Sequence, residues 1–118
     1  MTNSIPMSIK DAVHFAISVI PELTFKFKES PEKCDATQLA TTLKDFTHQT
    51  IRKKDWIRTE FSIRIVQYLL DRAEHTLKTA IYENYWFSFS KIKTECNPEE
   101  WSKIKDYIPK ELQMQFQV

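Results

Sequence analysis

Apolar residues recur every three or four positions along most of the chain, which predicts a series of amphipathic helices. The first covers residues 9–20, with Ser8 before it as a capping residue and Pro21 after it as a breaker. Residues 21–30 alternate in a strand-like way at three apolar positions, but a proline at the start of the segment favours a short helix.

The strongest boundary signals lie further along the chain. Asp35 with Gln38 three residues later is typical of a capping box, and Asn97 followed by Pro98 marks another helix start. The remaining expected helices cover residues 36–50, 56–72, 76–92 and 98–108, with a last short turn from Pro109 to Phe116. The sequence therefore predicts an all-α fold: a compact bundle of about six to seven helices arranged as stacked antiparallel hairpins. We expect a single domain over residues 1–118, with residues 1–7 flexible.

The helix expected at residues 56–72 is apolar on two faces, which is typical of a helix in the middle of a domain. One face holds Ile57, Phe61, Ile65, Tyr68 and Leu69, and the other holds Trp56, Ile63, Val66 and Leu70. A polar stripe of Glu60, Arg64, Gln67 and Asp71 is expected to separate them.

The helix expected at residues 76–92 carries more aromatic side chains than one buried face requires. Trp86 falls at the edge of its apolar arc and Phe87 on the opposite side. Aromatic side chains in excess of the core are typical of interface anchors, so we expect both to contact a protein partner. Nearby acidic residues could meet a basic partner, and we include them as expected contacts: Glu83, Glu95, Glu99 and Glu100.

Composition removes several classes of function. The chain of 118 residues contains no glycine, and phosphate-binding loops and nucleophile elbows require it. A net charge of +1, with no strongly basic segment, argues against direct nucleic-acid binding. The sequence lacks a signal-peptide pattern and an apolar run of membrane-spanning length. We therefore expect a cytoplasmic protein in which Cys34 and Cys96 stay reduced.

Catalytic and metal-binding patterns are also missing, so we expect no enzyme, cofactor or metal site. The histidines, His14, His48 and His75, stand apart from one another and from other ligand types. A Cys34–His48 nucleophile and base would depend on a chance approach in space. Small helical RNases of the HEPN group place an arginine several residues before a histidine on one helix, whereas Arg72 and His75 are only three residues apart.

Residues 43–92 resemble a known group of small helical bacterial proteins. Their sequence is LKDFTHQTIRKKDWIRTEFSIRIVQYLLDRAEHTLKTAIYENYWFSFSKI, in which an Asp-Trp turn leads into a long helix, a polar break and a helix with an aromatic-rich end. This pattern is similar to HEAT-like helical hairpins of immunity proteins from polymorphic toxin and contact-dependent growth inhibition systems. The resemblance implies a cytoplasmic protein that binds a cognate toxin domain, often a nuclease, and blocks its active site or substrate access. We expect a monomer; the alternatives are a helical adaptor without a toxin partner and a small metal-independent RNase.

Overall fold

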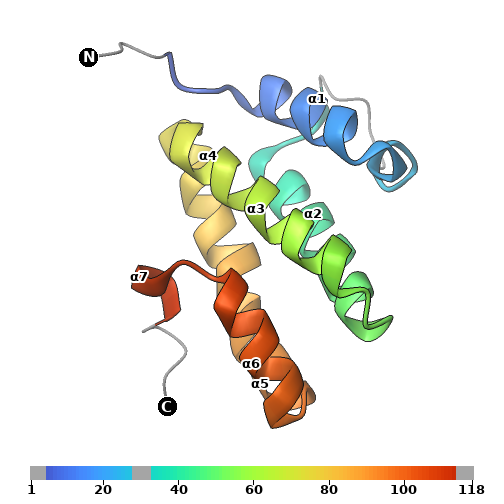
Figure 1. The fold of residues 1–118 in the computed structure, drawn as a ribbon. Coiled ribbons are helices and arrows are strands. Elements are labelled where there is room, and N and C mark those ends of the chain that lie inside the picture. The colour runs from blue at the N-terminus through green and yellow to red at the C-terminus, as the bar shows by residue number, and fades with distance from the viewer. Residues whose placement is uncertain (1–4, 28–32, 114–118) are drawn as a thin grey trace.

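The computed structural model describes residues 5–27 and 33–113, and the elements in these ranges are helical (Figure 1). The expected all-α class is confirmed. The elements are α1 (Ile9–Val19), η1 (Pro21–Phe25), α2 (Ala36–Arg52), α3 (Trp56–Arg72), α4 (His75–Ala80), η3 (Ile81–Tyr85), η4 (Trp86–Ser88), α5 (Phe89–Glu95), α6 (Pro98–Tyr107) and α7 (Lys110–Gln113).

Polar side chains begin the main helices as the sequence indicates. The side chain of Ser8 accepts a hydrogen bond from the backbone N–H of Asp11 at the start of α1. Complete capping boxes open α2 at Asp35 and α6 at Asn97, with Pro98 in the first turn of α6. The segment after Pro21 is a short 3₁₀-helix, in agreement with the helical alternative.

Residues 75–95 form one continuous helical rod in which the hydrogen-bonding pattern changes twice. It begins as α4, passes through a π-helical turn (η3) and a 3₁₀ turn (η4), and ends as α5. With this rod taken as one helix, the described residues form five longer helices, α1, α2, α3, the rod and α6. The expected six to seven helices therefore slightly exceed the number found.

The helices form a slab about two helices thick. Its extents are 39 × 36 × 21 Å, and a helix with its side chains is about 10–12 Å across. In Figure 1, α3 lies in front of α2, and α6 lies in front of α5. α2 packs against α3, α4 and η3, and α3 also packs against α6. The core lies between these layers, which leaves the outer faces of α3 and of the rod toward solvent.

The start of the described chain is attached to the end of α3. The N–H of Met7 donates to the carbonyl oxygen of Arg72 at 2.7 Å, and the N–H of Glu74 donates to the carbonyl oxygen of Met7 at 3.2 Å. Met7 and Ala73 thus form an isolated parallel bridge. The expectation of a flexible lead is corrected at Met7. Residues 1–4 and the end of the expected last turn, residues 114–116, lie outside the described residues.

Candidate functional site

The structure separates the two aromatic residues that the sequence pointed to. Phe87 is 74% exposed, and Glu83 is also exposed on the rod. Trp86 is completely buried, with its ring centroid 5.0 Å from Tyr85 and 5.5 Å from Phe89. The expectation of a partner contact at Trp86 is therefore corrected, because this side chain belongs to the core.

The π-helical turn explains the position of Trp86. A π turn accommodates an extra residue, and one residue of a regular α-helix corresponds to a rotation of about 100°. The side chains after η3 are therefore rotated relative to the wheel of a regular helix. Trp86, which follows this turn directly, is rotated from the edge of the apolar arc into the core.

The remaining three expected contact residues are not equivalent. Glu99 is exposed, whereas Glu95 and Glu100 line one cavity of about 190 Å³ between α2 and the junction of α5 and α6. The Glu100 carboxylate accepts the N–H of Asn97 at 3.1 Å and lies 3.4 Å from Nζ of Lys54. The hydrogen bond from Asn97 contributes most to lowering the pKa of Glu100. Glu100 therefore stabilises the fold locally.

This cavity also contains a histidine and a cysteine, but the electrostatics of the cysteine disfavour nucleophilic chemistry. Burial, Glu100 and Glu95 raise the pKa of the Cys96 thiol, so little of it is the reactive thiolate. Burial lowers the pKa of His48, whose Nε2 lies 3.1 Å from the Ser88 hydroxyl.

The cysteine that the sequence paired with His48 lies elsewhere. Cys34 is buried beside Phe27 in a different cavity, and the structure instead brings Cys96 to the cavity of His48. Across the described ranges, His, Cys, Asp and Glu residues form no group that could hold a metal ion.

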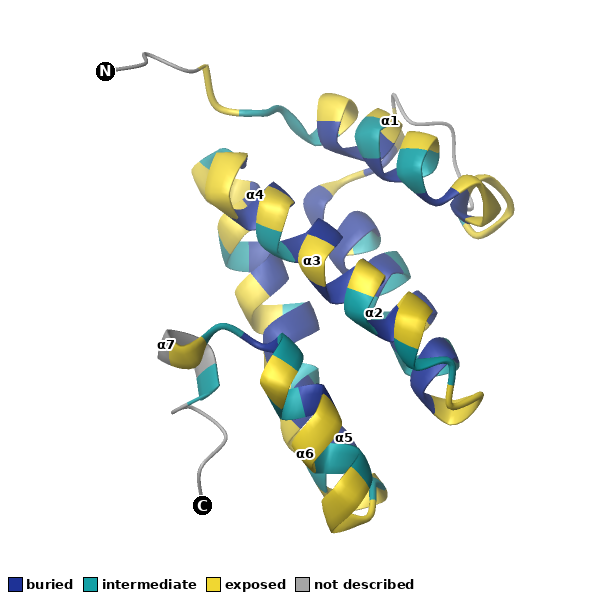
Figure 2. Ribbon diagram, viewed as in Figure 1, coloured by how far each residue is buried: buried dark blue, intermediate teal, exposed yellow. Residues whose placement is uncertain are grey.

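A larger candidate surface lies on α3, where the sequence predicted buried residues. Ile57 is 84% exposed, Phe61 44% and Tyr68 37%, and Arg64 and Arg72 are exposed on the same helix. We refer to these five residues as the α3 stripe. Figure 2 shows exposed positions along the side of α3 that faces the viewer. The prediction that both apolar faces of α3 are buried is wrong for Ile57, Phe61 and Tyr68, whereas Ile65 and Leu69 of the same face are buried.

The sequence contains a signal for this exposed stripe. At about 100° per residue, Arg64 falls beside Asp71 and Glu60 in the polar stripe between the two apolar faces. Arg72 instead falls inside the first apolar face, between Phe61 and Leu69. A charged residue inside an apolar face is rarely buried without a partner. The position of Arg72 therefore indicates that part of this face of α3 is open to solvent.

Ring stacking with α1 and contacts within α3 restrict three side chains of the stripe. Phe15 of α1 stacks on Tyr68 with ring centroids 4.7 Å apart and an interplanar angle of 19°. The guanidinium carbon of Arg72 lies 3.7 Å from the centroid of the same Tyr68 ring. Arg64 forms an ion pair with Glu60 at 2.6 Å.

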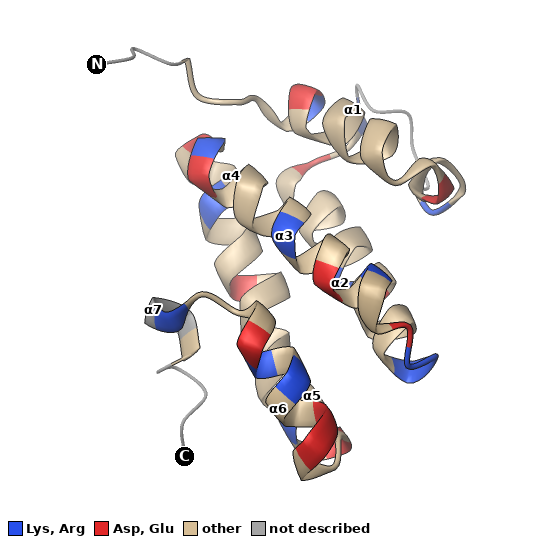
Figure 3. Ribbon diagram, viewed as in Figure 1, with Lys and Arg blue, Asp and Glu red and all other residues tan. Residues whose placement is uncertain are grey.

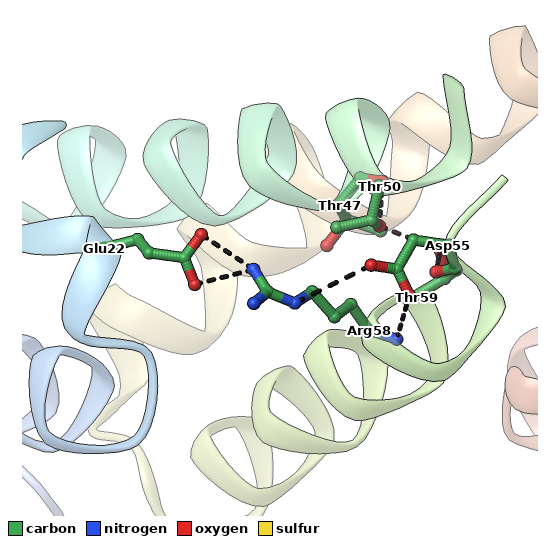
Figure 4. A network of polar contacts seen from close by, with 6 residues as sticks. All are labelled: Glu22, Thr47, Thr50, Asp55, Arg58 and Thr59. Atoms are coloured by element: carbon green, nitrogen blue, oxygen red, sulfur yellow. Dashed lines mark hydrogen bonds and ion pairs between the residues drawn. The ribbon is translucent and has the colours of Figure 1, made fainter. Parts of the chain in front are cut away.

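The first turn of α3 is attached to η1 and α2 through polar contacts (Figure 4). One guanidinium nitrogen of Arg58 donates to both carboxylate oxygens of Glu22 at 2.8 Å, and Nε of Arg58 lies 3.7 Å from Asp55. The hydroxyls of Thr50 and Thr59 are 2.8 Å apart in the buried contact between α2 and α3. Polar contacts with η1 and α2 therefore fix the helix that carries the stripe.

An open groove of about 550 Å³ borders the stripe on the side of α6 and α7. Glu60, Arg64 and Gln67 form its wall on α3, and Tyr107 and Ile108 lie on the opposite wall. Figure 3 shows acidic and basic positions interspersed on α3 and α6. The surface thus combines exposed apolar side chains, arginines and an adjacent concavity, which are typical features of protein interfaces.

A family model matches residues 13–118 of the chain, and its description is "Domain of unknown function (DUF7674)". The chain belongs to the DUF7674 family. No match was found among curated proteins or among solved structures. In the described part of this family member, each helix is too short or too polar to cross a membrane.

Proposed function

We propose that this protein is a cytoplasmic immunity protein that binds a cognate bacterial toxin domain one-to-one. The observation that carries the proposal is the α3 stripe, in which Ile57, Phe61 and Tyr68 are exposed. The helix that carries them is held by polar contacts with η1 and α2. Covering a large apolar side chain contributes about 1.5–3 kcal/mol when burial is complete. The resemblance of residues 43–92 to helical immunity proteins supports a toxin as the partner.

The protein would neutralise its partner by occupation of a surface, without a reaction of its own. Helix α3 packs against α2 and α6, and Phe15 of α1 stacks on its Tyr68. The exposed side of α3 therefore forms a rigid ridge that can cover an active site or the path of its substrate. The raised pKa of Cys96 disfavours a thiolate nucleophile in this protein, which supports a binding function.

The first experiment tests whether the gene immediately upstream encodes a toxin domain, which then serves as the probe. The lack of such a gene would count against the proposal. Co-expression of this protein should restore the growth of cells that produce the toxin domain, and calorimetry should give a one-to-one complex. The proposal fails if the purified proteins do not bind and growth is not restored.

Matched phenylalanine substitutions locate the contact surface. We expect Phe61→Ala to weaken toxin binding by more than about 1 kcal/mol, because an interface anchor is lost. Phe25→Ala is the control, since Phe25 is 91% exposed on η1 and is not part of the stripe. Phe87→Ala tests the surface that the sequence favoured. If only Phe87→Ala weakens toxin binding, the contact surface lies on the rod, where Glu83 is also exposed.

A helical adaptor without a toxin partner is the alternative that the same exposed side chains support. Such an adaptor would bind several proteins with micromolar affinity in a pull-down followed by calorimetry. A cognate immunity protein binds one toxin domain, and a tight complex with a single partner would exclude the adaptor.

A further inference from the structure

A side-chain contact and a backbone contact hold Arg72 in place at the end of the α3 stripe. Its guanidinium lies over the ring of Tyr68, and that ring is itself stacked on Phe15. Its carbonyl oxygen accepts the N–H of Met7 at 2.7 Å. The conformation of this arginine is therefore restricted before a partner arrives, so less side-chain entropy is lost on binding.

The charge of Arg72 also differs from that of the other α3 arginines. Arg58 forms an ion pair with Glu22, and Arg64 forms one with Glu60. Within the described ranges, Arg72 forms no ion pair, and its N–H contact to the carbonyl oxygen of Tyr68 is long, at 3.5 Å. A guanidinium has five N–H donors in a planar fork, so most of its donors remain available for an incoming acceptor.

We propose that the α3 stripe binds a protein surface that places a carboxylate against Arg72 and apolar side chains against Phe61 and Ile57. This inference rests on the proposed function, with the toxin domain as the partner. An arginine fork matches the two oxygens of a carboxylate, and the exposed apolar residues require apolar contacts beside it. The partner therefore has an acidic residue at the edge of an apolar patch.

The same residues disfavour two other occupants. A nucleic acid would require an excess of positive charge, whereas Arg58 and Arg64 are neutralised by acidic neighbours and the stripe includes Ile57 and Phe61. A second copy bound by two-fold symmetry about the middle of the stripe would place Arg72 against Ile57 of the other copy. The five residues of the stripe include no carboxylate that could receive the Arg72 guanidinium there.

The experiment measures the affinity of the toxin domain for wild-type protein and for Arg72→Met, Arg72→Lys and Arg52→Met. We expect Arg72→Met to lower the affinity at least about tenfold and to reduce its dependence on salt. Arg72→Lys should recover only part of the affinity, because an ammonium group cannot bind both carboxylate oxygens in the planar fork. Arg52→Met is the control, since Arg52 is an exposed arginine on α2 outside the stripe. Circular dichroism establishes that each variant is folded.

A charge exchange then identifies the carboxylate. Arg72→Glu should abolish binding, and one Asp→Arg or Glu→Arg substitution on the toxin domain should restore it. If the wild-type protein binds the toxin domain but Arg72→Met binds equally well, the carboxylate contact is wrong and the proposed function stands. If the wild-type protein does not bind, both fail.

Sedimentation of the chain alone and binding to a short RNA duplex complete the test. A monomer that leaves RNA unbound is the expected result. A dimer that Phe61→Glu dissociates, or RNA binding that Arg72→Met abolishes, would assign the stripe to another occupant and overturn the proposal.

Discussion

Two aromatic residues that follow one another in the chain have opposite environments. Trp86 makes aromatic contacts with Tyr85 and Phe89 in the core, whereas Phe87 is 74% exposed. Among the described residues, the buried indole N–H of Trp86 has no hydrogen-bond partner. Packing therefore outweighs the cost of one unsatisfied donor, which is about 1–3 kcal/mol.

This difference predicts opposite effects on stability. Trp86→Ala should lower the free energy of unfolding by about 3–5 kcal/mol, because it leaves a large cavity in the core. Phe87→Ala should change it by no more than about 0.5 kcal/mol, as expected of an exposed residue. Urea unfolding followed by circular dichroism measures both. Equal losses for the two variants would contradict the assigned burial.

His48 predicts a dependence of stability on pH. Burial, then Lys44 and Arg52, lower its pKa below the ordinary value of 6.5. Between the lowered folded pKa and the unfolded value of 6.5, the unfolded chain binds more protons at this residue, so stability falls as pH decreases through this range.

Urea unfolding at several pH values between about 7.5 and 5 measures this contribution. His48→Gln removes the titrating group and keeps a hydrogen-bonding side chain that can reach Ser88. We expect a weaker loss of stability on acidification in the variant than in the wild type. Identical pH profiles would show that His48 does not contribute.

At the scale of helices, the link between α2 and α3 contains a strained residue. Lys54 has a φ of 57°, a left-handed conformation that costs a residue other than glycine roughly 1–2 kcal/mol. The chain contains no glycine to occupy this position. The adjacent Lys53 has a φ of −81° and no such strain.

Lys54→Gly should therefore increase the free energy of unfolding by up to about 1 kcal/mol, because glycine adopts a positive φ without steric cost. The lost ion pair with Glu100 subtracts little, since the Lys54 side chain is 69% exposed. Lys53→Gly is the matched control and should lower stability. Urea midpoints distinguish the two, and a loss with Lys54→Gly would contradict the assigned strain.

At the scale of the molecule, a buried chain of hydroxyl groups connects α2, α3 and the rod. The hydroxyl of Thr47 donates to Ser62 of α3 at 2.9 Å and lies 2.8 Å from the hydroxyl of Tyr85. Because Thr47 uses its only proton toward Ser62, Tyr85 is the donor to Thr47. Burial raises the pKa of Tyr85, so its hydroxyl keeps that proton.

Thr47→Val should lower the free energy of unfolding by about 1–3 kcal/mol, because it removes the hydroxyl that bonds both Ser62 and Tyr85 in the buried core. Thr37→Val is the control for the same substitution at an exposed position of α2. Urea unfolding compares them. Equal stability of the two variants would show that the hydroxyl chain does not hold the helices together.

The sequence by itself determined the helices and their starts, because those depend on neighbours within a few residues. Ser8, Asp35 and Asn97 cap α1, α2 and α6 through side-chain contacts to the third residue after each of them. The proline at the start of η1 and the periodic apolar spacing act over equally short ranges.

Only the tertiary structure decided which apolar faces are covered. Ile57, Phe61 and Tyr68 have the spacing of a core face, but they are 84%, 44% and 37% exposed in the structure. Trp86 became a core residue because a π turn rotated it toward its neighbours in the core. Burial depends on the number and position of the neighbouring helices, which the periodicity of one segment does not contain.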